Sequence, residues 1–292
     1  MDKCTRRSFI KSMGVSALSL IVSPWALSAC GSEKTGPFDF VQMCDPQLGF
    51  GGYEHDLSTF RQAVKQINAL APAFVVICGD LVDDAEDKLF ADFKAIKAKL
   101  KVPCYCAPGN HDVGNEATAE SLKYYREVIG KDYYSFEYGG YTFLVVNTQL
   151  WKAPLEGESE KHDAWFRSEL KEASEKMRGV FVIGHYPLYL RKVDESERYE
   201  NLPKEKRAEL LNLFEEHGVV AMLGGHRHKT IINDYNGIQL VNAETTSKNI
   251  DGRPMGFRIW HVVEPRPFKH EFVPLDSNNI EKPGVRWRDT IR

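Results

Sequence analysis

Five apolar runs of this sequence end in short loops that carry polar side chains, and this pattern constrains the fold more than any other feature. Each run reads as a buried strand that stops where the polar residues begin. In open α/β sheets, ligands bind outside the carboxyl ends of the strands. We therefore expect an α/β fold whose strand ends build a binding site. The five loops are Asp45-Pro46-Gln47, Gly79-Asp80-Leu81-Val82-Asp83, Gly109-Asn110-His111-Asp112, Gly184-His185 and Gly225-His226-Arg227-His228.

The first half of the chain alternates between strand and helix patterns, and the second half is richer in strands. Apolar spacing predicts helices over residues 56–70, 88–100, 165–176 and 204–217. Predicted strands cover residues 38–44, 74–78, 102–106, 133–138, 141–147, 180–183, 219–223, 231–235, 238–241, 257–263 and 270–273. Gly139-Gly140 and Asn236-Gly237 indicate hairpins. We expect a single domain over residues 38–276 and a loose polar tail over 277–292.

Residues 1–29 have the features of an export signal. The stretch Thr5-Arg6-Arg7-Ser8-Phe9-Ile10-Lys11 resembles a twin-arginine signal, and an apolar run over residues 13–27 follows it. Residues 27–31 resemble the lipobox of bacterial lipoproteins, which would make Cys30 the lipidated first residue; a plain cleaved signal peptide is the alternative. We expect a flexible tether over residues 30–37 and a periplasmic or cell-envelope protein that meets the membrane only through Cys30.

The charge of the chain argues against nucleic-acid binding. Residues 1–29 contain four of the 38 basic and one of the 41 acidic side chains, so 34 and 40 remain without them. A mildly acidic protein lacks the basic surface that nucleic acids require. After the N-terminus, no run of about 18 apolar residues predicts a membrane span. No feature of the sequence indicates an obligate protein partner.

Four cysteines, Cys44, Cys78, Cys104 and Cys106, lie in apolar strand-like runs. Export would permit disulfides. Cys104 and Cys106 are expected to point to opposite faces of one strand. We expect buried free thiols, and one disulfide is the alternative.

Asp, Asn, Gln and neutral His are ligands that divalent metals accept. A single Asp after a strand is more often a helix cap, and a single Gly-His is more often a packed histidine. Five such loops in one order at strand ends favour a metal centre instead. Asp45 and Gln47 would then project beyond their strand toward a metal.

Several of these stretches resemble motifs of the calcineurin-like metallophosphoesterase superfamily, over nearly all of residues 38–276. Within the superfamily they are most similar to the calcineurin-like phosphoesterase domain-containing serine/threonine phosphatases. The resemblance implies a four-layer α/β/β/α sandwich and a metal-dependent hydrolase with two divalent ions, which could be manganese, iron, magnesium or zinc. The stretches are Asp45-Pro46-Gln47-Leu48-Gly49, Cys78-Gly79-Asp80-Leu81, Gly109-Asn110-His111-Asp112 and Gly114-Asn115.

The resemblance also implies roles for individual residues. Asp80 would bridge the two ions, and His111 would face the leaving-group oxygen as general acid, held and kept protonated by Asp83. Asn110 and His111 would contact the substrate. The remaining ligands would be Asp45, Gln47 and His228 in the first site, and Asn110, His185 and His226 in the second.

Two departures from the family pattern and one further arginine affect these roles. Gln47 stands where the superfamily commonly has His, so we expect weaker metal binding at the first site; ligation through water, or none, is the alternative. Asp84 stands where the large protein phosphatases place a phosphate-binding arginine. Arg227 is a candidate phosphate contact, with a surface ion pair as the alternative.

Two segments could border the site. Residues 186–207 form a long charged loop that is either a substrate-recognition rim or simply solvated. Residues 51–55 form a second, flexible rim, in which His55 could replace the missing imidazole.

We expect hydrolysis of phosphomonoesters, either of a phosphoprotein or of a small phosphorylated solute. Metal-bound water has a pKa near 7, so a metal-bound hydroxide would attack phosphorus at neutral pH. His111 would protonate the leaving group. A phosphodiesterase acting on cyclic nucleotides or phospholipid head groups is the first alternative, and a non-catalytic interaction module is the second.

Overall fold

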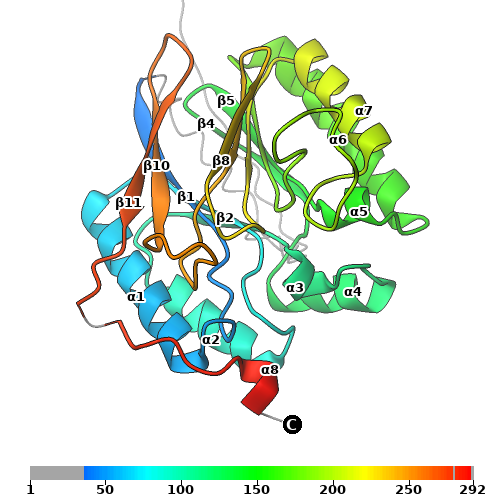
Figure 1. The fold of residues 1–292 in the computed structure, drawn as a ribbon. Helices are drawn as coiled ribbons and strands as arrows, with labels where there is room; N and C mark the ends of the chain where they lie inside the picture. Colours follow the sequence, from blue (N-terminus) through cyan, green and yellow to red (C-terminus); the bar gives the residue numbers. More distant parts are fainter. Residues whose placement is uncertain (1–35, 279, 291–292) are drawn as a thin grey trace, which may run out of the picture. The chain divides into compact units, whose positions relative to one another are not determined.

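The computed structural model describes residues 36–278 and 280–290; the predicted signal segment and Cys30 lie outside these ranges. The first of two sheets has the strand order β11-β10-β1-β2-β3 (Figure 1). Its strands β1, β2 and β3 are parallel, and β10 and β11 complete the sheet in antiparallel pairing. Their bounds are β1 (Phe38–Met43), β2 (Val75–Cys78), β3 (Cys104–Ala107), β10 (Gly256–Val262) and β11 (Lys269–Pro274).

The second sheet has the order β4-β5-β6-β7-β9-β8, with β5, β6, β7 and β9 parallel. The two predicted hairpins join each edge strand to its neighbour, β4 to β5 and β8 to β9. Both central residues of each turn, Gly139-Gly140 and Asn236-Gly237, have positive φ, as the tightest hairpin turns require. The bounds are β4 (Tyr134–Tyr138), β5 (Tyr141–Val145), β6 (Val180–Ile183), β7 (Val219–Gly224), β8 (Ile231–Tyr235) and β9 (Ile238–Asn242).

Helices cover the outer faces of the two sheets, which gives the four layers that were predicted (Figure 1). Helices α1 (Tyr53–Leu70) and α2 (Asp87–Lys97) pack on the first sheet, and α6 (Glu158–Lys176) and α7 (Lys204–Glu216) pack on the second. The inner faces of the sheets meet in a largely aromatic core. In this core the ring of Phe143 lies 5.0 Å from that of Phe74 and 4.7 Å from that of Phe181. These two sheets therefore form one rigid platform for their strand ends.

Four helices were not predicted: α3 (Asn110–Val113), α4 (Ala119–Val128), α5 (Gln149–Lys152) and α8 (Trp287–Thr290). Three of them span a single turn, too short for apolar periodicity to show. Helix α4 did carry a signal, because the Thr118 side chain accepts a hydrogen bond from Ser121 N–H as a helix cap. Within the described residues, no helix is long and apolar enough to cross a membrane.

The four cysteines are free thiols. The prediction that Cys104 and Cys106 point to opposite faces of their strand is wrong. Both pack into the core beneath the helices, and Tyr105 between them packs into the core between the sheets. Side chains two residues apart share one face of a strand, which accounts for this arrangement.

Residues 280–290 pack against the loop after β1 and are not loose. Gly284 N–H donates to the Gly51 carbonyl at 2.7 Å, and Trp287 N–H donates to the Gly49 carbonyl at 2.7 Å. A Cβ on Gly52 would lie 2.6 Å from the Gly284 nitrogen, so only glycine allows this approach. The glycines after β1, predicted to be a flexible rim, are instead a docking surface for residues 280–290.

Candidate metal centre

The carboxyl ends of β1, β2, β3, β6 and β7 meet where the two sheets adjoin, and all seven predicted ligands are buried there. None of the seven side chains is more than 8% exposed. Buried polar groups are costly unless they are paired or bind an ion. Two overlapping groups of acidic and histidine side chains have ligand atoms within 4.8 Å of one another, and Asp80 belongs to both.

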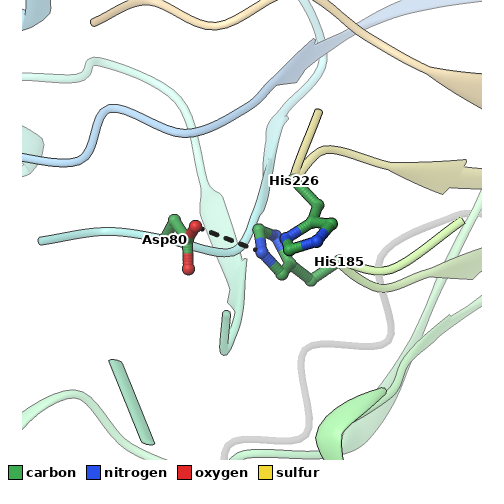
Figure 2. A group of neighbouring side chains, drawn as sticks. All are labelled: Asp80, His185 and His226. Carbon is green, nitrogen blue, oxygen red and sulfur yellow. Dashed lines mark ion pairs between the residues drawn. The ribbon is translucent and has the colours of Figure 1, made fainter. Parts of the chain in front are cut away.

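The first group contains Asp80, His185 and His226 (Figure 2). The Nε2 of His185 lies 3.2 Å from Asp80 Oδ2 and 3.0 Å from Asn110 Oδ1. Asn110 Oδ1 is also 3.0 Å from His226 Nδ1. Neighbouring ligand atoms on an octahedral ion with bonds of about 2.1 Å are about 3.0 Å apart. The four side chains therefore have the spacing of a coordination shell.

The hydrogen bonds of His185 indicate which atom would bind the ion. Its Nδ1 lies 2.8 Å from the Cys78 carbonyl, which can only accept, so Nδ1 carries a hydrogen. In the neutral ring Nε2 then presents a lone pair to the oxygens of Asp80 and Asn110, which are acceptors as well. A cation between these atoms removes the repulsion.

The second group contains Asp45, Asp80 and His228. His228 Nδ1 is 2.9 Å from the Lys248 carbonyl, and its Nε2 faces Asp45 Oδ1 at 3.9 Å. Gln47 points its amide nitrogen at Asp83 Oδ1, at 3.3 Å, while its buried Oε1 has no hydrogen-bond partner among the described residues. A buried amide oxygen without a hydrogen-bond partner fits a metal ligand.

Backbone strain is concentrated at this centre. Seven described residues other than glycine have a positive φ, and five of them are predicted ligands: Asp45, Gln47, Asp80, His226 and His228. Such conformations cost about 1–3 kcal/mol each and persist where the surrounding structure enforces them. They turn the side chains back toward a common point just beyond the strand ends.

Glycines beside the ligands permit the close approach of the loops. A Cβ on Gly109 would lie 2.1 Å from the backbone nitrogen of Asp80, and one on Gly225 would lie 2.5 Å from Asp45 Oδ2. The glycine in each of these motifs is therefore a packing requirement of the centre.

Without a cation, the pKa values of the buried groups at the centre are strongly shifted. Burial raises the pKa of Asp45 to about 8; His185 lowers this pKa and the facing carboxylate of Asp80 raises it. Burial also opposes ionisation of Asp80, but His185 and His111 hold its pKa below the usual range. Burial disfavours the charged form of His185, but Asp80 and Asp45 raise its pKa to about 10. Below the pKa of Asp45, the His185 imidazolium thus pairs with the Asp80 carboxylate while Asp45 holds a proton, and divalent ions would take the place of these two protons.

Two other histidines are held in the neutral form that binds metal. Burial, and then the proximity of His185, lower the pKa of His226 well below its ordinary value. Burial lowers the pKa of His228 to about 4. With Asp45 and Asp80 ionised, the centre then carries only two negative charges.

His111 lies beside the centre and is held by Asp83, chiefly through its backbone. The Nδ1 of His111 is 2.7 Å from the Asp83 carbonyl oxygen and 3.4 Å from its Oδ1. The backbone N–H of His111 donates to Asp80 Oδ1 at 2.9 Å. The carboxylate of Asp83 is mainly occupied by Arg286, whose Nε donates to Oδ2 at 2.7 Å. Sequence reasoning missed Arg286, which lies in the predicted tail.

Of the two segments expected to border the site, the loop after His185 does so, whereas His55 in the other segment is held by backbone carbonyl oxygens. In the loop after His185, the Tyr199 hydroxyl accepts a hydrogen bond from Asn110 Nδ2 at 3.1 Å. The rings of Tyr199 and Tyr186 lie 5.0 and 4.2 Å from that of His226, so this loop does border the centre. By contrast, both ring nitrogens of His55 face carbonyl oxygens, those of Glu281 and Ser247, so His55 does not replace the missing imidazole.

A polar cleft of about 400 Å³ opens beside the centre and is lined by Asn110, His111 and Arg288 among others. Arg227 is not among its lining residues. The Nη1 of Arg227 is 3.2 Å from Glu200 Oε1, which is the ion pair considered as the alternative to phosphate contact. A contact of Arg227 with phosphate stays a prediction.

Comparisons with known proteins agree with this geometry. Residues 40–230 match the family described as calcineurin-like phosphoesterase. The chain is 33% identical over 280 residues to the Bos taurus protein named serine/threonine-protein phosphatase CPPED1, covering 86% of this chain and 89% of the relative. It is 27% identical to an Arcobacter nitrofigilis protein named "Probable glycerophosphodiester phosphodiesterase GpdQ", covering 64% and 68%. A crystal structure of a dimetal phosphatase from Danio rerio matches with a TM-score of 0.60 at 16% identity, covering 82% and 99%.

We predict that Asp80→Ala loses both metal ions, because Asp80 belongs to both groups of ligand atoms. Metal content of the purified variant, measured by mass spectrometry after manganese loading, checks this. Asp84→Asn is the matched control, since Asp84 lies in the adjacent cleft but outside both groups. An Asp80→Ala protein that retains two ions would refute the bridging role.

We predict that Gln47→His tightens the weaker of the two metal sites, because imidazole is a stronger ligand than an amide oxygen for intermediate metals. Titration with manganese, followed by calorimetry, should show one dissociation constant falling by about tenfold and the other unchanged. Identical titrations for the two proteins would mean that Gln47 does not bind the ion.

Proposed function

We propose that this chain, which belongs to the calcineurin-like phosphoesterase family, hydrolyses phosphomonoesters at its dinuclear metal centre. Family membership makes it a metal-dependent hydrolase of phosphate esters. The proposal for monoesters is carried by the charge of the ligand set. Asp45 and Asp80 are the only acidic side chains in the two groups, and the histidines His226 and His228 are neutral. Two dications would leave a net charge of about +2, which suits a phosphomonoester dianion better than a diester monoanion.

The residues of the centre would hold two divalent ions between them. When bound, two divalent ions would polarise the phosphoryl oxygens and the attacking water. Asp45, Gln47 and His228 would hold one ion, and Asp80 would be shared by both. The other ion would be held by Asn110, His185 and His226. Burial of every one of these side chains would exclude bulk water and strengthen the electrostatic interactions.

His111 would protonate the leaving group. Its Nδ1 hydrogen is directed to the Asp83 carbonyl oxygen, 2.7 Å away, which leaves Nε2 for proton transfer. The residue lines the cleft beside Asn110, so its ring is accessible to a substrate bound there. An alkoxide is a poor leaving group, and a general acid accelerates its departure by about 10²–10⁴-fold. Asp83 would act as a positioning residue through its backbone.

The substrate would be either a phosphoprotein or a small phosphorylated solute. The match to proteins named serine/threonine-protein phosphatase over 86% of this chain supports the first. The predicted export of the chain favours the second, because phosphoproteins are scarce outside the cytoplasm. Similarity to a protein named as a glycerophosphodiester phosphodiesterase, over a smaller share of the chain, keeps diester hydrolysis as the alternative.

A panel of substrates tests the proposal. The manganese-loaded protein should hydrolyse phosphoserine, glycerol 3-phosphate and phenyl phosphate with kcat/KM at least tenfold above that for bis-(nitrophenyl) phosphate, glycerophosphocholine and cyclic AMP. Protein without added metal is the control. The opposite order, with the diesters hydrolysed faster, would overturn the monoester assignment and leave the family assignment intact.

We predict that His111→Asn retains both metal ions and loses about 10²–10⁴-fold in kcat on alkyl phosphates. The loss on nitrophenyl phosphate should be much smaller, because nitrophenolate leaves without protonation. Steady-state rates on the two substrates, with metal content measured in parallel, check this. Equal losses on both substrates would show that His111 is not the general acid.

A further inference from the structure

The last helix of the described chain, α8, brings a guanidinium to the cleft beside His111. The Nη2 of Arg288 lies 3.4 Å from His111 Nδ1, and Arg288 lines the same cleft as His111 and Asn110. Figure 1 shows α8 in red at the bottom of the view. The polar tail thus reaches His111, which lies 177 positions earlier in the chain.

Arg288 is held in place by the two residues that precede it. Arg286 donates to both carboxylate oxygens of Asp83. Trp287 donates through its indole nitrogen to Glu86 Oε2 at 2.9 Å and through its backbone to Gly49. The bidentate contact of Arg286 with Asp83 and the hydrogen bonds of Trp287 fix the direction from which Arg288 enters the cleft.

The guanidinium of Arg288 retains free donor capacity. Its Nη2 is 2.8 Å from the Asp83 carbonyl oxygen and 2.8 Å from Asp84 Oδ1, and its Nε is 3.4 Å from Asp83 Oδ2. None of these contacts uses Nη1, and the side chain is 35% exposed. Two N–H groups of a cation are therefore available beside the proposed general acid, at a cleft whose lining also includes Asp83, Asp84, Asp112 and Glu116.

We propose that Arg288 contacts an oxyanion of the substrate in this cleft. It would supply the phosphate-ester site with the cation that is missing at position 84, where Asp84 stands in place of the phosphate-binding arginine of the large protein phosphatases. The inference rests on the proposed phosphoester chemistry. The oxyanion could be the phosphoryl group itself, or a second anionic group carried by the leaving group. Both would be recognised by the same charge-assisted hydrogen bonds from a planar guanidinium.

Calorimetry on the manganese-loaded full chain tests the contact without turnover, with inorganic phosphate as the probe. Arg288→Ala should weaken phosphate binding by about 10- to 100-fold if the phosphoryl group is the contact, which is the usual effect of losing a hydrogen bond to a charged group. Lys282→Ala is the matched control, a cation removed from an exposed position of the same segment, and should bind phosphate like the unchanged protein.

A pair of substrates tests the second source of the oxyanion. Glycerol 3-phosphate and 3-phosphoglycerate differ in that a carboxylate replaces a hydroxymethyl group. If the leaving group carries the contacted anion, Arg288→Ala should lower kcat/KM for 3-phosphoglycerate by about tenfold or more, with glycerol 3-phosphate and phosphate binding unaffected. Either result supports the proposal and identifies the source.

Unchanged phosphate binding together with an unchanged substrate ratio, in an Arg288→Ala protein that retains both metals, would overturn the proposal. Should that variant lose metal, Arg288→Gln replaces it, because glutamine can still donate to the Asp83 carbonyl but carries no charge. Unaltered protein that binds phosphate yet hydrolyses no monoester would refute the proposed function, while the calorimetry would still decide the role of Arg288.

Discussion

Two buried carboxylates that face one imidazole are the feature on which the rest of this structure depends. Asp45 and Asp80 both lie near His185, at 3.8 and 3.2 Å, in a region without solvent exposure. One imidazolium can balance only one of them, and burial raises the pKa of Asp45 to about 8, so that Asp45 holds a proton at neutral pH unless a cation is bound. A buried charge without a partner is far more costly than any single hydrogen bond can offset. Divalent cations resolve this conflict, and the surrounding neutral histidines and amide oxygens have the chemistry to bind them.

The fold concentrates these groups by bringing parallel strands of two different sheets to one edge. The aromatic core between the sheets and the helices on the outside hold the strand ends rigidly. That rigidity allows five of the ligand residues to remain in left-handed backbone conformations. Gly109 and Gly225, which have no side chain, let adjacent loops approach within contact distance of Asp80 and Asp45. The stability of the core thus offsets the free-energy cost of the strained backbone and the buried charges at the centre.

Much of the centre could be predicted from sequence because each ligand belongs to a short local motif at the end of an apolar run. The strand ends and the buried cluster followed from those motifs, and the four layers followed from the family resemblance that the motifs carry. The role of the C-terminal segment could not be predicted, because 203 positions separate Arg286 from Asp83 and residues 280–290 show no periodicity. The Asp83–His111 contact was found, but its geometry was not: a backbone carbonyl makes the shorter contact, and no side-chain pattern encodes a carbonyl. Cys104 and Cys106 were wrongly predicted to point to opposite faces, because side chains two residues apart in a strand share one face.

The most direct test of the central claim is the position of the metal ions. Crystals of the manganese-loaded protein, measured at the manganese absorption edge, should show two anomalous peaks. One peak should lie among Asp80, Asn110, His185 and His226, and the other should lie among Asp45, Gln47, Asp80 and His228. Peaks outside these residues, or strand ends too far apart to share an ion through Asp80, would contradict the account.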